Sequence, residues 1–303
     1  MPADNPVTAE KVALGRRLFY DVRLSGNGTQ ACASCHQQKR AFTDGCAHAL
    51  GSTGESHPRS AMSLANVAYG ASLTWIDAGR RTLEDQMLVP LLGEAPREMN
   101  LGGHENEIGA RLHDDPLYSK LFSEAFPGEE SPTSLRNVQR AIASFERTLV
   151  SGNSAYDRLV WKDEREALSP AARRGMALFF SATLACSRCH GGFTFSGPVT
   201  WAGGPAPAPA FEDNGLGGRF RVPTLRNIAV TAPYMHDGRF ATLDAVIDHY
   251  AAGGAPSPTR SPLVRGFAIT RGEKNELVSF LESLTDTAFL VDPLFSDPWK
   301  SGP

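Results

Sequence analysis

The chain has 303 residues, a length that predicts two domains of roughly 150 residues each. Hydrophobic residues make up 41% of it and charged residues 21%, which is typical of an ordinary globular protein. The formal net charge of -3 argues against nucleic acid as a partner, and no apolar run is long enough to span a membrane.

The first predicted element is a helix that begins after Thr8. Threonine is a favourable N-cap, and Glu10 then lies in the first turn, at the positive end of the helix dipole. One face of this helix consists of Val12, Gly15, Leu18 and Phe19. A glycine-rich turn over residues 25–28 connects the helix to the next feature of the chain.

Residues 32–36 have the sequence Cys-Ala-Ser-Cys-His. Two cysteines separated by two residues and followed at once by a histidine are the attachment signature of a c-type haem. Cys32 and Cys35 are expected to bond the two vinyl groups of the porphyrin. This bonding places His36 under the ring, where its imidazole can bind the iron.

The second half of the chain repeats this plan. Ser169 predicts a helix start, and Pro170 suits the first helical position. Residues 175–179 then repeat the Gly-x-x-Leu-Phe pattern of residues 15–19. The repetition predicts a duplicated helical unit, each copy leading into a haem motif.

Cys186, Cys189 and His190 form the second copy of the motif. Two C-x-x-C pairs also suit a structural zinc site, and a single pair suits a redox disulfide. Neither alternative requires the histidine that follows both pairs, so haem attachment is the preferred interpretation. The fifth cysteine, Cys46, is expected to be a small buried residue rather than a reactive thiol.

The remaining elements complete a mainly helical plan. Residues 42–74 show little periodicity and are expected to wrap a cofactor. Further helices are predicted at residues 83–92, 138–149, 243–250 and after Thr270, which forms a capping box with Glu273. Residues 151–154 are expected to start a linker, residues 203–209 to form an exposed stiff loop, and no segment is predicted as a strand.

The predicted fold is therefore mainly α, with two cytochrome c-like helical haem domains, residues 1–154 and 155–303, that carry long irregular haem-wrapping loops. Covalent haem attachment generally takes place outside the cytoplasm, so we expect a bacterial periplasmic protein. The N terminus lacks the basic and apolar succession of a signal peptide, which we expect to have been removed.

The chain resembles bacterial di-haem cytochrome c peroxidases, and more closely their MauG-type branch. Besides the haem motifs, the resemblance is carried in the family's order by residues 24–28, 41–45, 83–86, 90–92, 97–99 and 222–238. Residues 57–59 and 249–254 are most similar to MauG-like enzymes encoded with methanobactin-type copper proteins. Those enzymes are understood to oxidise a tryptophan of a partner protein to kynurenine.

The resemblance implies that the N-terminal domain reacts with peroxide and that Gln86, Pro90 and Glu98 form its distal pocket. A carboxylate beside bound peroxide can move a proton from the inner to the outer oxygen, so that water leaves as the O–O bond breaks. The spacing between Gln86 and Glu98 is longer than in the best-known members of the family. A surface charge in a loop is the alternative role for Glu98.

Many of these peroxidases block the first iron with a loop histidine, and Ser52 occupies that position here. The resemblance therefore implies an open or water-bound iron. His48 and His57 do not align with the blocking histidine and are expected to pack at the surface or within the loop.

The C-terminal domain is expected to transfer electrons. Peroxidases of the family use a methionine as the sixth ligand of this haem, but no methionine follows Met235. The MauG branch uses a tyrosine, matched by Tyr250, and an anionic tyrosinate stabilises oxidised iron. Core packing is the alternative role for Tyr250, and Met235 and His236 are weaker rival ligands.

Three further features follow from the resemblance. Trp75 matches a tryptophan that lies between the haems and can pass electrons between them. A calcium ion between the domains would bind backbone oxygens of Thr231 and Pro233, although Ser60 replaces the usual asparagine. Haem propionates or solvent are the expected partners of Arg80, Arg221 and Arg226.

The resemblance implies an oxidoreductase that uses hydrogen peroxide to reach a high-valent, bis-iron(IV)-like state. That state would oxidise a side chain, most simply tryptophan to kynurenine, on a copper-binding periplasmic protein by long-range electron transfer. MauG carries a relay tryptophan where this chain has Leu184. Trp161 or Trp201 is therefore the expected point at which oxidising holes leave this protein and electrons enter it. The alternatives are a peroxide-scavenging peroxidase fed by a small cytochrome or copper protein, and a plain electron carrier.

Overall fold

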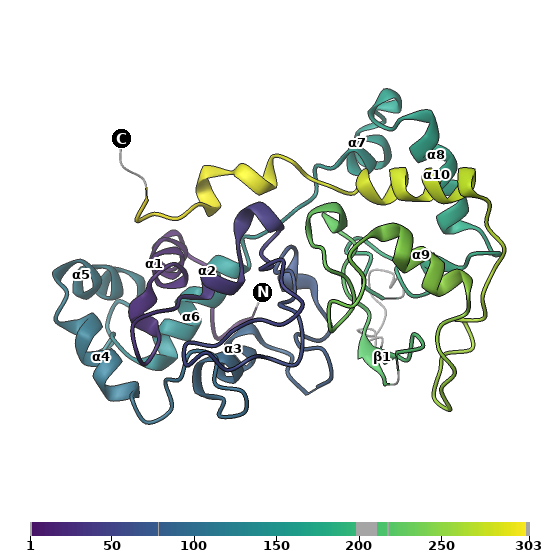
Figure 1. Ribbon diagram of the computed structural model, residues 1–303. Coiled ribbons are helices and arrows are strands. Elements are labelled where there is room, and N and C mark those ends of the chain that lie inside the picture. Colours follow the sequence, from purple (N-terminus) through teal and green to yellow (C-terminus); the bar gives the residue numbers. More distant parts are fainter. Residues whose placement is uncertain (1, 78, 198–210, 217, 301–303) are drawn as a thin grey trace.

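The computed structural model describes residues 2–77, 79–197, 211–216 and 218–300 (Figure 1). Its helices are α1 (Ala9–Phe19), α2 (Cys32–Cys35), α3 (Leu83–Leu92), α4 (Glu105–His113), α5 (Pro116–Ala125), α6 (Leu135–Glu146), α7 (Ala155–Lys162), α8 (Pro170–Phe180), α9 (Leu243–Ala251) and α10 (Arg271–Glu282). The fold is mainly helical, as predicted. Within the described ranges, no helix is both long and apolar enough to cross a membrane.

Among the described residues, the strand content is a single short pair that the sequence did not predict. Strands β1 (Phe211–Glu212) and β2 (Phe220–Arg221) are antiparallel, with Phe211 opposite Arg221 and Glu212 opposite Phe220. Each has only two residues. A two-residue strand is too short to show the alternation of apolar and polar residues from which strands are predicted.

The predicted helix starts are confirmed by their caps. The side chain of Thr8 accepts a hydrogen bond from the backbone N–H of Lys11, and that of Ser169 accepts one from Ala172. Thr270 forms a complete capping box with the third residue of α10. These side chains satisfy N–H groups that otherwise have no partner at a helix start.

Three helices between the haem motifs were not predicted, namely α4, α5 and α7. Two of them carry sequence signals that were available. Asp115 caps α5, with Pro116 at the first helical position. Ser154 and Asp157 form the capping box of α7, so the segment described above as the start of a linker ends directly in a helix.

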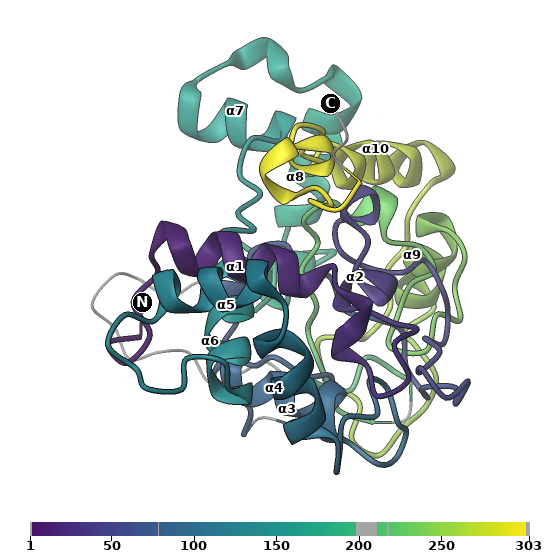
Figure 2. The ribbon, with the colours of Figure 1, turned by 90° about the vertical axis from the view of Figure 1, so that its left-hand side faces the viewer.

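Two matched helix crossings organise the two halves of the molecule. In the first half α1 packs against α6, and in the second α8 packs against α10 (Figures 1 and 2). A Cβ atom at Gly15 would overlap the carbonyl oxygen of Ala141, and one at Gly175 would overlap that of Glu276. The repeated glycine therefore marks the point in each half where two helix backbones touch.

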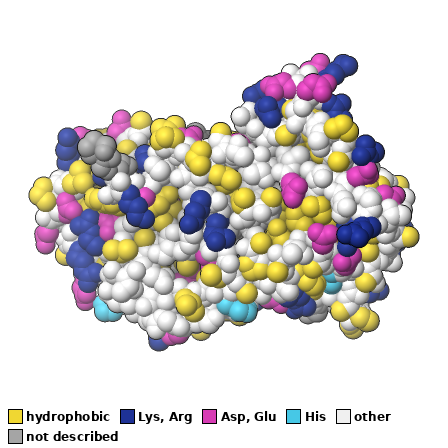
Figure 3. Space-filling view, turned by 45° about the horizontal axis from the view of Figure 1, so that its top comes forward, with side chains coloured by type: hydrophobic (Ala, Val, Ile, Leu, Met, Phe, Trp, Pro, Cys, Tyr) yellow, Lys and Arg dark blue, Asp and Glu magenta, His cyan; other side chains and the backbone are white. Residues whose placement is uncertain are grey.

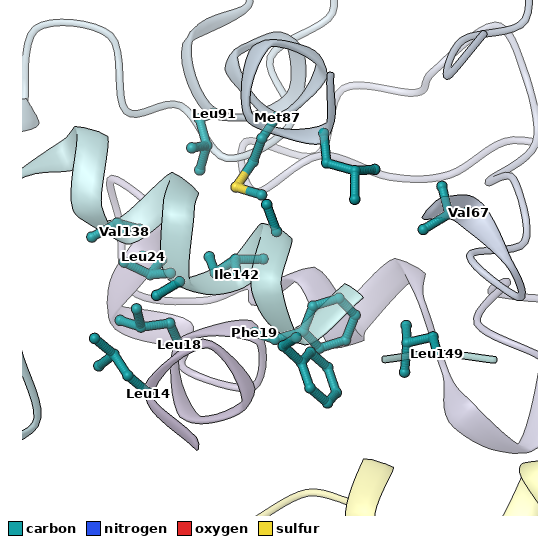
Figure 4. Close-up of a cluster of buried hydrophobic side chains, with 14 of the residues drawn as sticks. Leu14, Leu18, Phe19, Leu24, Val67, Met87, Leu91, Val138, Ile142 and Leu149 are labelled. Atoms are coloured by element: carbon teal, nitrogen blue, oxygen red, sulfur yellow. The ribbon is translucent and has the colours of Figure 1, made fainter. Parts of the chain in front are cut away.

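Each crossing lies within its own hydrophobic core. Figure 4 shows the first core, where Leu14, Leu18 and Phe19 of α1 meet Val138 and Ile142 of α6. The second core contains, among others, Phe179 of α8, Phe195, Phe280 of α10, and Leu284, which follows α10. The two cores agree with a two-domain organisation, although the boundary between residues 154 and 155 stays a prediction.

A repeated asparagine joins the two halves. Asn66 and Asn227 both have a left-handed backbone with φ of 59°. The N–H of Asn66 donates to the carbonyl of Leu149, and that of Asn227 donates in the same way to Leu284. The buried Ser151 donates its N–H to the side-chain oxygen of Asn66 and accepts the amide of Asn227, at 3.0 Å in both cases. Ser151 is thus bonded to both copies of the repeat.

The C-terminal segment after α10 returns to the first half. Phe289 and Phe295 belong to the first core, and the amide of Gln38 donates to the carbonyl of Phe289 at 3.2 Å. The hydroxyl of Tyr20 donates to the carbonyl of Phe295 at 2.7 Å. Figure 1 shows this segment in yellow, running from α10 across to α1. The last residues therefore pack with the domain that begins the chain.

The crossing at Gly15 leads to a first prediction. Gly15→Ala should lower the free energy of unfolding by about 1–3 kcal/mol, the usual cost of inserting a methyl group into a packed interface. Urea unfolding of the haem-loaded protein measures this cost. Gly109→Ala is the matched control, because its methyl group would meet only the Thr133 carbonyl oxygen, at 3.9 Å. Equal stability of the two variants would contradict the close crossing.

Candidate active site

The first haem motif forms one turn of helix, α2, followed by its histidine. The N–H of His36 donates to the carbonyl of Cys32 at 2.9 Å, which closes the turn. The Nδ1 atom of His36 lies 2.8 Å from the carbonyl oxygen of Phe42 and is placed to donate to it. Burial lowers the pKa of His36, which favours the neutral imidazole. The ring is therefore oriented with Nε2 free, the arrangement of a metal-binding histidine.

The second motif has the same local geometry. The N–H of His190 donates to the carbonyl of Cys186 at 2.9 Å. Its Nδ1 lies 3.1 Å from the carbonyl oxygen of Phe195, and burial lowers its pKa. Phe42 and Phe195 both have a positive φ, at 63° and 50°. The strained turn that aims each carbonyl at its histidine is thus part of the repeat.

The four motif cysteines suit haem attachment better than the two alternatives. Burial raises the pKa of Cys32, Cys35 and Cys186 to about 12 and that of Cys189 to about 11. Zinc ligands and redox cysteines need the thiolate form, which such surroundings oppose. Among the described residues, no group of three histidine, cysteine, aspartate or glutamate side chains is arranged to hold a metal ion.

A large cavity opens above the second motif. It measures about 1160 Å³, and its wall includes Cys186, Cys189, His190 and Tyr250. The guanidinium of Arg221 also lines it, and burial alone lowers the pKa of Arg221 to about 10. No carboxylate among the described residues offsets the effect of burial on Arg221, and a haem propionate would do so, so the residues present fit a haem group here.

Tyr250 shares this cavity with His190, as the resemblance implies for the two axial ligands. Burial raises the pKa of Tyr250 to about 12, and a hydrogen bond from the amide of Asn214, at 3.4 Å, opposes that rise. The same amide nitrogen lies 3.6 Å from the sulfur of Met235. The rival ligand Met235 is therefore close to Tyr250, whereas the ring of His236 stacks on Phe220 with 3.7 Å between centroids.

The distal residues predicted for the first haem lie around one end of α3. Gln86 and Pro90 are one turn apart, and the carbonyl of Pro90 accepts the N–H of Met99 at 2.9 Å. This bond places Glu98 beside the helix. Burial raises the pKa of Glu98, and its charge adds, as a smaller effect, to the burial that raises the pKa of Cys32. The Glu98 carboxylate is therefore close enough to the first haem motif to act on it electrostatically.

One neighbour of the Glu98 carboxylate was not predicted from the sequence. The Nε2 atom of His57 lies 3.8 Å from Oε1 of Glu98, at ion-pair distance. His57 was expected to pack in the loop, and its spacing from Glu98 in the sequence gives no signal of the contact. The N–H of Ser52 donates to the carbonyl of Glu98 at 2.7 Å, so the residue in the position of the blocking histidine instead holds the carboxylate's backbone.

Trp75 lies between the two halves. Its indole N–H donates to the carbonyl of Ser60 at 2.9 Å, and its own carbonyl accepts the N–H of Arg221 at 2.8 Å. Its side chain lines both the second haem cavity and a pocket of about 590 Å³ beside it. The candidate calcium ligands, Thr231 and Pro233, line this smaller pocket between the halves together with Ser60.

The comparisons with known proteins identify the family. A profile of the family described as di-haem cytochrome c peroxidase matches residues 9–165. The methylamine utilization protein MauG of Methylorubrum extorquens is 37% identical over 93% of this chain and 80% of its own length. The cytochrome c peroxidase Ccp of Escherichia coli is 34% identical over 82% of this chain and 54% of its own length. The chain belongs to the di-haem cytochrome c peroxidase family.

A solved structure is similar over nearly the whole chain. The crystal structure of a MauG-like protein associated with microbial copper homeostasis has a TM-score of 0.94 and 40% identity, and the match covers 99% of this chain and 96% of that one. The protein is thus a di-haem oxidoreductase of the peroxidase family, and membership implies two haem c groups, hydrogen peroxide as oxidant and, from MauG, a protein substrate.

The other arginines and tryptophans considered above have different surroundings. The buried Arg226 forms an ion pair with Asp157, and Arg80 pairs with Asp85, so both already have a carboxylate partner. Leu184, in the position of the relay tryptophan, is buried. Trp161 on α7 is 70% exposed, beside a charged turn that projects from the molecule (Figure 3). Trp201 lies outside the described residues.

The expectation for Cys46 is wrong, because this residue is exposed rather than buried. The carboxylate of Asp44 accepts the N–H of Cys46 at 2.8 Å, and this turn presents the thiol at the surface of the haem loop. Composition alone cannot distinguish a loop cysteine from a core one, because both have the same apolar character.

The neighbouring positions of Tyr250 and Met235 lead to a second prediction. In the haem-loaded protein Tyr250→Phe should abolish the low-spin signal of the second haem, because a phenyl ring cannot bind iron. Met235→Leu should leave that signal in place. Electron paramagnetic resonance of the oxidised protein measures both. Loss of the signal in Met235→Leu alone would make the thioether the ligand.

Proposed function

We propose that this protein uses hydrogen peroxide to oxidise a side chain, most simply tryptophan to kynurenine, on a copper-binding partner protein in the periplasm. The main support is the second cavity, where a tyrosine lies with His190 in a family whose peroxidases use methionine. The solved MauG-like protein, associated with copper homeostasis, supports the choice of partner.

The chain's own residues would divide the work between its halves. Cys32, Cys35 and His36 would hold one haem, with the matching second motif and Tyr250 holding the other. Bound there, the haems would accept the oxidising equivalents of peroxide and retain them. The remaining tasks, which are proton transfer, exclusion of bulk solvent and electron relay, belong to side chains.

Glu98 is the proposed proton carrier of the peroxide step. Its carboxylate would take the proton from the inner peroxide oxygen and return it to the outer one, which leaves as water. The amide of Gln86 would donate a hydrogen bond in the same pocket, and the ring of Pro90 would limit access to it. Trp75 borders both the second cavity and the pocket between the halves, which suits a relay of electrons.

The size of the substrate requires oxidation at a distance. A folded partner cannot enter the pocket beside Glu98, so electrons must travel from its side chain through this protein. Conversion of tryptophan to formylkynurenine removes four electrons and takes two oxygen atoms from water, and two peroxide molecules accept those electrons. Hydrolysis then releases formate. The exposed Trp161 is the candidate point of electron entry.

A calcium ion is proposed for the pocket between the halves. Thr231 and Pro233 would offer backbone oxygens, and Asp44 in the same wall would offer a carboxylate. Ser60 donates its hydroxyl to the carbonyl of Met235 at 3.1 Å, so it can act only through a lone pair of its oxygen. Backbone and carboxylate oxygens are the ligands that calcium prefers.

A peroxide-scavenging peroxidase is the second candidate function. The nearness of Met235 to Tyr250 favours it, because a methionine ligand would make the second haem an ordinary acceptor of electrons from a small cytochrome. The plain electron carrier is set aside, since the family is enzymatic and a carrier has no need of a distal carboxylate.

The peroxide step gives a third prediction. Glu98→Gln should slow the reaction of the oxidised enzyme with peroxide by roughly 10²- to 10⁴-fold, the usual contribution of a positioned acid–base group. Stopped-flow absorbance of the haem-loaded protein measures the rate. Glu94→Gln is the matched control, because Glu94 is an exposed glutamate in the same segment. Normal reaction of Glu98→Gln would assign the proton to another group or to water.

The fourth prediction concerns the product. Incubation of the enzyme with peroxide and a copper-binding partner protein should give a partner in which one tryptophan has gained two oxygen atoms and then, on hydrolysis, lost its formyl group as formate. Peptide mass mapping identifies the residue. Trp161→Phe should slow this modification but not the reaction with peroxide. Rapid oxidation of a reduced small cytochrome, with the partner unmodified, would favour the peroxidase.

A further inference from the structure

A short hairpin in the first haem loop supports the distal carboxylate. Residues 49–57 fold back on themselves, with the N–H of His57 donating to the carbonyl of Ala49 at 2.8 Å. The N–H of Gly51 donates to the carbonyl of Glu55 at 2.8 Å within the same turn. Backbone hydrogen bonds thus hold both ends of the hairpin, and they fix the position of the His57 backbone.

The hairpin lies directly against the backbone that carries Glu98. Besides the bond from Ser52 to the carbonyl of Glu98, the carboxylate of Glu55 accepts the N–H of Arg97 at 3.0 Å. A Cβ atom at Gly51 would overlap the carbonyl oxygen of Arg97. This position requires glycine because the two backbones touch. The contact fixes the distance between His57 and Glu98.

The surroundings of the His57 ring satisfy two protonation states. When the neutral ring carries its proton on Nε2, Nδ1 accepts the N–H of Arg59 at 3.1 Å. When Nδ1 carries a proton, it donates to the carbonyl oxygen of Arg59, also at 3.1 Å. Nδ1 therefore has a backbone partner in either form of the ring. The side chain of His57 is 22% exposed and that of Glu98 is 30% exposed, so the pair reaches solvent.

We propose that His57 carries protons between solvent and Glu98. The inference rests on the proposed role of Glu98 in the peroxide reaction. Reduction of hydrogen peroxide to two waters consumes two electrons and two protons. Proton transfer within the peroxide molecule releases the first water, so both external protons must reach the pocket as the electrons return. His57 is the titratable side chain at ion-pair distance from Glu98 among the described residues.

The other charged groups nearby are occupied. Arg97 pairs with Glu55 at 3.4 Å. The charge of Glu98 also acts on Cys32 and Cys35, which would be thioethers in the haem-loaded protein. Burial raises the pKa of Glu98 and His57 opposes that rise, so removal of the imidazole should raise the pKa further. The carboxylate would then be ionised over a narrower range of pH.

Two substitutions separate proton transfer from support. His57→Asn keeps an acceptor for the N–H of Arg59 but lacks the group at Nε2, whereas His57→Gln can place an amide N–H there that does not titrate. His48→Gln is the matched control, because His48 is an exposed histidine on the same loop whose Nδ1 lies 3.1 Å from the carbonyl of His57. All variants are compared as haem-loaded proteins.

Two measurements decide the matter. Infrared spectra of the resting enzyme are recorded over a range of pH, and the spectra of Glu98→Gln are subtracted from them. The difference gives the pH at which half of the Glu98 carboxyl is ionised, called the midpoint. This midpoint should rise by roughly one pH unit in His57→Asn, the low end of the effect of a nearby opposite charge. Stopped-flow mixing with peroxide and then ascorbate follows the return to the resting spectrum. Over the pH range in which the wild-type Glu98 carboxyl is ionised, this return should be slower by roughly 10²-fold in both His57 variants, the low end of the contribution of a positioned acid–base group, because neither amide can deliver a proton.

The outcomes are distinct. If His57→Gln behaves like the wild type in both measurements, His57 only supports Glu98 and the proton transfer is overturned. Wild-type behaviour of both His57→Asn and His57→Gln would overturn it as well. A change in His48→Gln as large as in His57→Asn would also contradict the assignment. If Glu98→Gln reacts normally with peroxide, the proposed role of Glu98 fails and proton transfer from His57 fails with it, whereas wild-type behaviour of the His57 variants alone leaves the role of Glu98 intact.

Discussion

The contact between helix backbones at Gly15 and Gly175 is the constraint on which both halves depend. Each contact locks two helices that are distant in sequence, and each haem motif follows the first helix of its pair. The carbonyl groups of Phe42 and Phe195 then orient the motif histidines, and both phenylalanines have a left-handed backbone conformation. Helix crossing, turn and histidine form one unit, and the chain contains it twice.

The two copies differ on the side opposite the histidine. In the first half, a hairpin and the end of α3 place Glu98 and His57 together, which suits proton transfer. In the second half, α9 places Tyr250 in an apolar cavity, where burial raises its pKa and the amide of Asn214 opposes that rise. The same unit of helix crossing, turn and histidine therefore faces a different set of side chains in each half.

The sequence was most informative where a local signal is strong. The haem motifs, the caps at Thr8 and Ser169 and the capping box at Thr270 depend on neighbouring residues, and all three helix starts are confirmed. Helix α4 was missed because the side chain of its cap, His104, makes no capping hydrogen bond to the backbone of the first turn, and histidine is not a preferred capping residue.

Contacts between distant segments gave no such signal. The approach of His57 to Glu98 depends on how a hairpin packs on a later loop, and no periodicity encodes it. The exposure of Cys46 depends on the path of the haem loop. The family resemblance named Glu98 and Tyr250 as candidates, but it named neither His57 nor Asn214, the side chains that contact them in the structure.

The return of the C-terminal segment to the first half makes one core depend on both ends of the chain. Phe289 and Phe295 belong to a core whose other buried members lie before residue 150, so this core is complete only when the C-terminal segment is in place. A cut after residue 285 would spare the helices of the second half and open the first core beside α1. The stability of the half that carries the first haem motif therefore depends on residues from the far end of the chain.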